Sequence, residues 1–143
     1  MDIYSKSKRS ELMSKIKGKE TKSEILVRKY IFSKGFRYRK NVRKLHGTPD
    51  IVLKKYKTII FIHGCFWHLH QGCKEGRLPR SNGTYWKEKL ERNVNRDKRN
   101  ISVLASLGWK VIVIWECEIR NAALRNNRLV KLIDEITGQD IQN

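Results

Sequence analysis

The chain has 143 residues, a length typical of one domain and sufficient for a hydrophobic core. It carries 32 Lys and Arg against 14 Asp and Glu, a formal net charge of +18, so we expect a polyanionic partner, with nucleic acid as the first candidate. Apolar runs such as IIFI and VIVIW are far too short to cross a bilayer, and the first twenty residues lack the apolar stretch of a signal peptide. We therefore expect a cytoplasmic protein with reduced thiols and no membrane partner.

The predicted elements form a single domain over residues 21–143, preceded by a flexible basic arm at residues 1–20. A helix is predicted over residues 21–35, because Thr21 and Glu24 have the spacing of a capping box and Gly35 follows the last apolar position. Alternation predicts a strand at residues 36–42, and the turn at Pro49 leads into a second strand that ends near residue 53. A hairpin turn at residues 54–57 then precedes a continuous apolar strand at residues 58–63, for which we predict burial on both faces.

A loop over about residues 64–83 comes before a long helix at about residues 85–107, which Gly108 ends. A further buried strand is predicted at residues 109–116, and an amphipathic helix at about residues 126–137. The order of helix, three strands, helix, strand and helix predicts an α/β fold with a mixed sheet flanked by helices.

The loop sequence HGCFWHLHQGC, residues 63–73, contains potential metal ligands at short spacing. Cys65, His70 and Cys73 form a Cys-x4-His-x2-Cys arrangement suited to Zn²⁺, and Cys117 is the only other cysteine that could complete a tetrahedral site. Because a closed site with four protein ligands has no open position, we expect this zinc to be structural. The alternative is three ordinary thiols beside a surface histidine.

Asp97 interrupts an apolar stripe on the long helix. The stripe has spacings of 4, 4, 3, 4 and 3 residues, which lie on one helical face. A carboxylate in such a position needs a charged or hydrogen-bonding partner. His68 is one candidate, and a fixed imidazole suits general acid–base chemistry; a Lys or Arg at the edge of the core is the other. The stripe consists of Trp86, Leu90, Val94, Asp97, Ile101 and Leu104.

Asp50 follows Pro49 at the start of a predicted strand, and the neighbouring strand ends in Ile62 and His63. Nucleases of the PD-(D/E)xK type hold a metal-binding aspartate at such a position. The second strand here lacks their further carboxylate and lysine, and Pro-Asp is also common in turns. A metal-binding Asp50 is therefore one interpretation among several.

Three segments together resemble the very-short-patch-repair (Vsr) endonucleases: GTPDIV, FIHGCFWHLHQGC and YWKEKLERNVNRDKRNISVLASLGWKVIVIWECE. The resemblance runs from about residue 8 to residue 137. It implies a PD-(D/E)xK-like (restriction-endonuclease-like) fold with a structural zinc. It also implies Mg²⁺-dependent nicking of one strand of double-stranded DNA, 5′ of the T in a T·G mismatch left by deamination of 5-methylcytosine.

The same resemblance implies a monomer that works in the cytoplasm, at the nucleoid of a bacterium, alongside a cytosine-5 methyltransferase and repair proteins. It implies roles for individual residues as well. Asp50 and the carbonyl of Ile62 would bind Mg²⁺, and the zinc ligands would be Cys65, His70, Cys73 and Cys117. Ile62 stands where the family often has Thr, and the gap between His70 and Cys73 is longer by one residue than in some relatives.

By the same resemblance, His68 would be the catalytic histidine with Asp97 as its partner, and His63 would lie near the scissile phosphate. Glu24 resembles an active-site carboxylate, although capping alone explains its spacing from Thr21. The DNA-contacting residues implied are a wedge that enters from the major groove and an arm residue on the minor-groove side: Phe66, Trp67 and Trp86 for the wedge, and Met13 for the arm.

Two other functions fit part of the pattern. A restriction-type endonuclease of the same fold would cut correctly paired DNA on both strands. A zinc-stabilised DNA-binding protein without enzymatic activity would account for the charge, the zinc ligands and the aromatic residues, but not for Asp50, His68 and Asp97 together.

Overall fold

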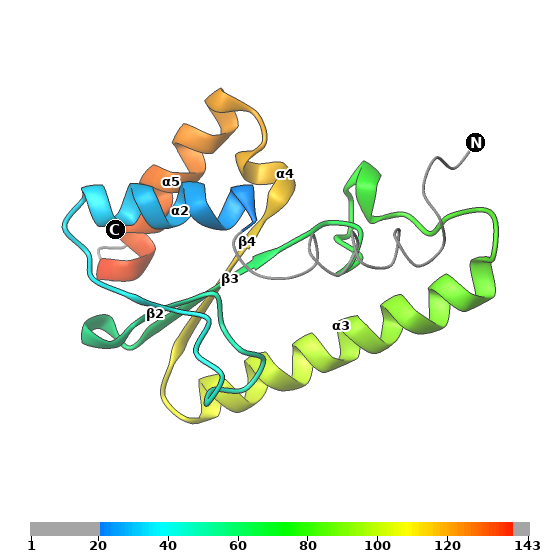
Figure 1. The fold of residues 1–143 in the computed structure, drawn as a ribbon, viewed down its shortest axis with the longest axis horizontal. Coiled ribbons are helices and arrows are strands. Elements are labelled where there is room, and N and C mark those ends of the chain that lie inside the picture. The colour runs from blue at the N-terminus through cyan, green and yellow to red at the C-terminus, as the bar shows by residue number, and fades with distance from the viewer. Residues whose placement is uncertain (1–20, 139–143) are drawn as a thin grey trace.

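The sheet has four strands in the order β1-β2-β3-β4 in a computed structural model that describes residues 21–138 (Figure 1). Strands β1 and β2 pair antiparallel, as do β2 and β3, whereas β3 and β4 run parallel. The parallel pair needs a long connection, and helix α3 provides it. The sheet is therefore mixed, as predicted. The predicted arm at residues 1–20, with Met13, lies outside the described residues.

The elements follow the predicted order, with one short helix added. The strands are β1 (Arg39–Lys40), β2 (Ile51–Leu53), β3 (Thr58–His63) and β4 (Lys110–Trp115). The α-helices are α2 (Lys22–Ser33), α3 (Gly83–Ser106), α4 (Glu116–Ile119) and α5 (Ala122–Thr137). Single 3-10 turns occur at η1 (Lys54–Tyr56) and η2 (Lys74–Gly76).

Side chains of the sheet alternate between two hydrophobic layers, as the twofold period of a strand requires. Ile60 of β3 and Ile114 of β4 face α2 and α5, where Val27 and Leu132 complete the layer. Ile59 and Phe61 of β3 face α3 and pack with Leu104. Helices therefore cover both faces, with α2 and α5 on one side and α3 on the other (Figure 1). The prediction that β3 is buried on both faces is confirmed.

Three predicted elements differ from the structure in their extent or their burial. The strand predicted at residues 36–42 is reduced to Arg39–Lys40, because Phe36 turns into the core and Asn41 has a φ of 51°, which ends the extended conformation. Strand β4 is only partly buried, since it lies at the edge of the sheet and only Ile112 and Ile114 are fully covered. The last helix begins at Ala122, four residues earlier than predicted, because the side chain of Asn121 caps its first turn.

Helix α3 presents the predicted stripe to the rest of the molecule. Leu90 and Leu104 are buried, and the other four members, Asp97 included, are partly buried. Within residues 21–138, no helix combines the length and the apolar character that crossing a membrane would require.

Candidate active site and metal centre

A cleft of about 700 Å³ opens between five parts of the chain. These are the start of α2, the start of β2, the end of β3, the loop after β3 and one face of α3. The sequence elements that meet here are far apart along the chain, and the sheet register brings them together. Eight of the predicted site residues line the cleft: Glu24, Asp50, Ile62, His63, Phe66, Trp67, His68 and Asp97.

Asp50 lies at the entry to β2, with its carboxylate against the neighbouring strand. Its Oδ2 accepts a hydrogen bond of 2.7 Å from the backbone N–H of Ile62. Burial raises the pKa of the Asp50 carboxyl from 3.8 to about 7; the charge of Glu24 adds to the rise, and the hydrogen bond from Ile62 opposes it. A nearby divalent cation would favour the ionised form, so the donor set of Asp50 and the adjacent β3 backbone suits a hard cation such as Mg²⁺.

Glu24 is buried at the N-terminus of α2 and takes part in capping. Its backbone N–H donates to Thr21 Oγ1 at 3.2 Å, and Thr21 Oγ1 donates to Glu24 Oε1 at 3.3 Å. The carboxylate also lies 3.9 Å from Nη1 of Arg28. Because Glu24 both caps the helix and lines the cleft, its two predicted roles are compatible in one position.

His68 and Asp97 meet across the cleft, which is one of the two pairings that the helical stripe left open for Asp97. The distance from His68 Nδ1 to Asp97 Oδ2 is 2.5 Å, and the two side chains are 26% and 21% exposed. The partner of Asp97 is thus His68, and no Lys or Arg within residues 21–138 forms an ion pair with it. A carboxylate on Nδ1 orients the ring and leaves Nε2 available for proton transfer.

His63 packs face to face with His68, a contact that the sequence did not predict. The ring centroids are 3.9 Å apart and the planes differ by 3°. His63 is buried, and its Nδ1 has no hydrogen-bond partner among the described residues. Burial, with a further contribution from the charge of His68, lowers the pKa of His63 to about 4, so His63 is neutral near pH 7.

The stacking also limits what His63, His68 and Asp97 can bind, although their ligand atoms lie within 4.8 Å of one another. A histidine binds a metal through a lone pair in the plane of its ring, at about 2.0–2.1 Å. Because the two rings are parallel and stacked, their lone pairs lie in two separate parallel planes and do not converge on one point. A single ion would have to sit well out of at least one plane, so the stacking disfavours chelation of one ion by both rings.

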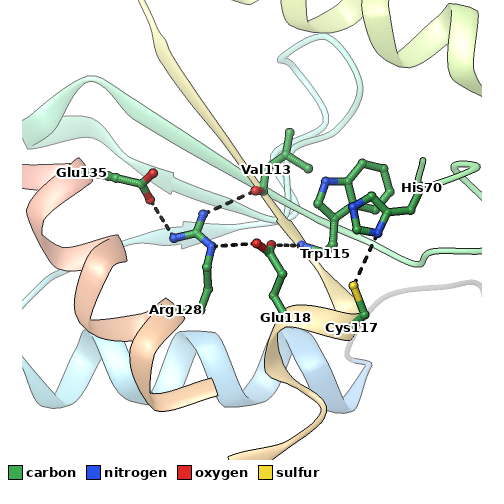
Figure 2. Close-up of polar contacts among 7 residues, drawn as sticks. All are labelled: His70, Val113, Trp115, Cys117, Glu118, Arg128 and Glu135. Carbon is green, nitrogen blue, oxygen red and sulfur yellow. Dashed lines mark hydrogen bonds and ion pairs between the residues drawn. The ribbon is translucent and has the colours of Figure 1, made fainter. Parts of the chain in front are cut away.

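A second cluster lies beside the first and contains the four predicted zinc ligands. The sulfur atoms of Cys65, Cys73 and Cys117 and a ring nitrogen of His70 all lie within 4.8 Å of one another, with Cys117 Sγ 3.4 Å from His70 Nδ1 (Figure 2). Tetrahedral zinc with bonds of about 2.0–2.3 Å places its ligand atoms roughly 3.3–3.8 Å apart, so a small contraction would complete the site. Burial raises the pKa of the Cys65 thiol to about 12, and a bound cation would reverse that effect.

Turns in the loop give the cysteines and His70 their positions. The N–H of His70 donates to the carbonyl of Cys65, and the N–H of Cys73 donates to the carbonyl of His70. Gly76 packs directly on this segment: a Cβ there would lie 2.1 Å from the carbonyl oxygen of His70. Sequence reasoning missed Gly76, because a close backbone approach has no signature beyond glycine itself.

The aromatic residues predicted to form a wedge contact one another, and two of them, Phe66 and Trp67, line the cleft. Ring centroids are 5.1 Å apart for Phe66 and Trp67, 5.3 Å for Phe66 and Trp86, and 6.0 Å for Trp67 and Trp86. Tyr85, which is 57% exposed, extends the group, and Lys89 Nζ lies within about 6 Å of three of these rings. Tyr85 and Lys89 were not predicted as site residues. Their spacing of one helical turn on α3, next to Trp86, is the sequence feature that could have identified them.

Asn93 fixes the loop to α3 and was also missed. Its Nδ2 donates to the carbonyl of Trp67 at 3.1 Å, which holds the loop over the cleft. Further along the same helix, Arg96 and Asn100 line the cleft opposite Thr48. The cleft therefore combines a carboxylate, an acid–base pair, partly exposed aromatic rings and basic side chains, which together suit a nucleic-acid substrate.

Comparison with known proteins agrees with this chemistry. A family model described as DNA mismatch endonuclease Vsr matches residues 1–75. The chain is 54% identical over 135 residues to "Type II nicking enzyme V.NmeAIP" of Neisseria meningitidis, covering 94% of this chain and 96% of that protein. It is 41% identical to "Type II nicking enzyme V.XorIIP" of Xanthomonas oryzae pv. oryzae, with 93% and 97% covered. To "DNA mismatch endonuclease Vsr" of Escherichia coli it is 36% identical, with 94% and 86% covered. The chain belongs to the Vsr family of DNA endonucleases.

Proposed function

We propose that this protein nicks one strand of duplex DNA on the 5′ side of the T in a T·G mismatch, with Mg²⁺ as the catalytic cofactor and Zn²⁺ as a structural one. The observation that carries the proposal is the meeting of Asp50, the His68–Asp97 pair and the aromatic cluster in one cleft. The relatives named as nicking enzymes support cleavage of one strand, and the relative named as a mismatch endonuclease supports the mismatch. The arrangement corresponds to a PD-(D/E)xK-like nuclease in which β3 is present but lacks the usual second carboxylate and lysine.

Asp50 and the backbone carbonyl of Ile62 are the proposed Mg²⁺ ligands. When bound, Mg²⁺ would neutralise phosphate charge and activate water for phosphodiester hydrolysis. His68, oriented by Asp97, would move a proton through Nε2. Neutral His63, stacked on His68 and buried, would provide a hydrogen-bonding edge beside the scissile phosphate without a positive charge that would repel a protonated His68. Glu24 lies next to Asp50 as a further carboxylate of the same cleft.

Selection of a mismatch would come from Phe66, Trp67 and Trp86. Opening a base step for an inserted ring costs less at a poorly paired step than in intact duplex. The +18 charge would supply affinity for the phosphate backbone independently of sequence. We further propose that the protein acts as a monomer in the cytoplasm, at the nucleoid, on lesions left behind by a cytosine-5 methyltransferase.

The test uses duplexes that differ at one position only, T·G or T·A, with each strand labelled in turn. We expect a single nick, in the T strand of the T·G duplex, when Mg²⁺ is present. Omitting Mg²⁺ without adding a chelator leaves the zinc centre intact and should abolish the nick. Equal cutting of the T·A duplex on both strands would instead support the restriction-type endonuclease, and binding without any cut would support a non-enzymatic DNA-binding protein.

A further inference from the structure

Trp115, the last residue of β4, lies between the two clusters of the site. Its indole stacks on His70 with centroids 4.0 Å apart and an interplanar angle of 7°. The same ring meets His63 edge-on at 5.1 Å and 75°, and His68 at 6.4 Å and 73°. Continuous ring contacts therefore run from the Cys–His cluster, through Trp115, to the histidine pair that faces Asp97.

Strand register is the reason for this position. His63 of β3 and Trp115 of β4 are direct partners in the parallel pair, so their side chains leave the sheet on the same face. Trp115 does not line the cleft and would not touch DNA there. Any influence that it has on the reaction must therefore be indirect, through the residues that its ring contacts.

The backbone at Trp115 is held by a partly buried charge network (Figure 2). The N–H of Trp115 donates to Glu118 Oε1 at 2.8 Å, and Glu118 Oε2 lies 3.5 Å from Arg128 Nε. Arg128 also contacts Glu135 Oε1 at 2.8 Å and donates to the carbonyl of Val113 at 3.5 Å. Helix α5 thus fixes the end of β4, and the indole has a defined position relative to both clusters.

The position of the His63 ring depends on such packing because Nδ1 accepts or donates no hydrogen bond within residues 21–138. Its Nδ1 is buried without a partner among the described residues. Three rings surround the imidazole instead: His68 packs face to face, Phe61 lies at a centroid distance of 5.7 Å, and Trp115 packs edge-on. With no hydrogen bond at Nδ1 to set its direction, the orientation of the imidazole is determined by the shape of the space between these rings.

We propose that Trp115 is a positioning residue for the nicking reaction: it holds the His63–His68 pair in register with Asp97 by bracing it against the Cys–His cluster. The inference rests on the proposed nuclease function. It predicts that removing the flat ring slows the chemical step more than it weakens DNA binding, because displacements of about 1 Å at reacting groups can cost on the order of 100-fold in rate.

The test compares Trp115→Leu and Trp115→Met, which remove the ring, with Trp115→Phe, which keeps a smaller one. Trp109→Leu is the matched control: Trp109 precedes the same strand, is also partly buried, and packs in the layer under α3 away from the histidines. Single-turnover nicking at saturating enzyme, the dissociation constant for T·G duplex, the zinc content and the thermal midpoint are measured for each. Having two ring-free variants guards against one of them failing to fold.

We expect the ring-free variants to nick roughly 10- to 100-fold more slowly, with a dissociation constant within about 3-fold of wild type and zinc retained. Trp115→Phe should recover most of the rate, and Trp109→Leu should lower the thermal midpoint while leaving the rate nearly unchanged. Wild-type rates in both ring-free variants would overturn the proposal. So would a rate loss that accompanies loss of zinc, or one that Trp109→Leu reproduces.

A second readout separates this inference from the proposed function. Inter-ring nuclear Overhauser contacts between His63 and His68 in the DNA-free protein should weaken in the ring-free Trp115 variants but not in Trp109→Leu, whereas a shift of the histidine signals alone would follow from the lost ring current. If wild-type protein fails to nick T·G duplex, the proposed function fails, and the NMR comparison still decides whether Trp115 sets the orientation of the two histidines. Unchanged contacts between the His63 and His68 rings would refute the positioning role by themselves.

Discussion

Replacing Asp50 with asparagine should make the protein more stable and inactive at the same time. The carboxylate is held in a buried position where the protonated form is favoured, since its pKa rises from 3.8 to about 7. At about 1.4 kcal/mol for each pKa unit, the ionised carboxylate costs the folded protein roughly 4 kcal/mol at alkaline pH. Asparagine has nearly the same shape, carries no charge and can still accept the hydrogen bond from Ile62.

The expected gain depends on pH in a defined direction. Because the folded pKa of Asp50 lies above the unfolded value, the folded protein binds the proton more tightly than the unfolded chain does. The stability of the wild-type protein therefore falls, through this group, as pH rises from about 4 to about 7. The advantage of Asp50→Asn should be roughly 2–4 kcal/mol at pH 8 and less than half of that at pH 5.

Urea unfolding followed by tryptophan fluorescence at pH 5 and pH 8 measures this difference. The buffers contain neither added Mg²⁺ nor chelator, so the Cys–His cluster is undisturbed. Glu91→Gln is the control for loss of one negative charge, because Glu91 is exposed on α3; it should not stabilise the protein. Added Mg²⁺ should stabilise wild type by mass action and leave Asp50→Asn unchanged. A variant no more stable than wild type at pH 8, or equally stabilised at both pH values, would refute the reasoning about burial.

Three further changes test the rest of the site. Asp97→Asn should slow nicking by roughly 10²–10⁴-fold with little change in DNA affinity, and the double variant with His68→Ala should be no slower than His68→Ala alone; additive losses in single-turnover kinetics would show that the two residues act separately. Cys117→Ser should lose zinc in elemental analysis and lower the thermal midpoint, whereas full zinc content with unchanged stability would exclude Cys117 as a ligand. Trp67→Ala should weaken discrimination between T·G and T·A duplexes by about 1–3 kcal/mol in competitive nicking assays, and an unchanged ratio would place Trp67 among the packing residues.

Local spacing in the sequence was enough to predict the features that depend on neighbours in the chain. The helical period put Asp97 on the inward face of α3, and the continuous apolar run of β3 predicted burial on both faces; the structure confirms both. The spacing of Cys65, His70 and Cys73 likewise predicted a common cluster, which the loop forms. The place of Asp50 at the start of a strand made it one possible metal ligand, and resemblance to a known family favoured that interpretation and added Ile62, which no periodicity singles out.

Tertiary structure alone decided which distant groups meet. Sequence left Asp97 a choice between His68 and a basic residue, and the fold settled it by placing α3 across the end of β3. The position of Trp115 between His70 and His63 had no sequence signal, because it follows from the parallel register of β3 and β4. The stack of His63 on His68 had no sequence signal either. A side-chain period records which face a residue occupies along its own element, whereas strand register and the crossing of a helix over a sheet are set by the packing of the whole core.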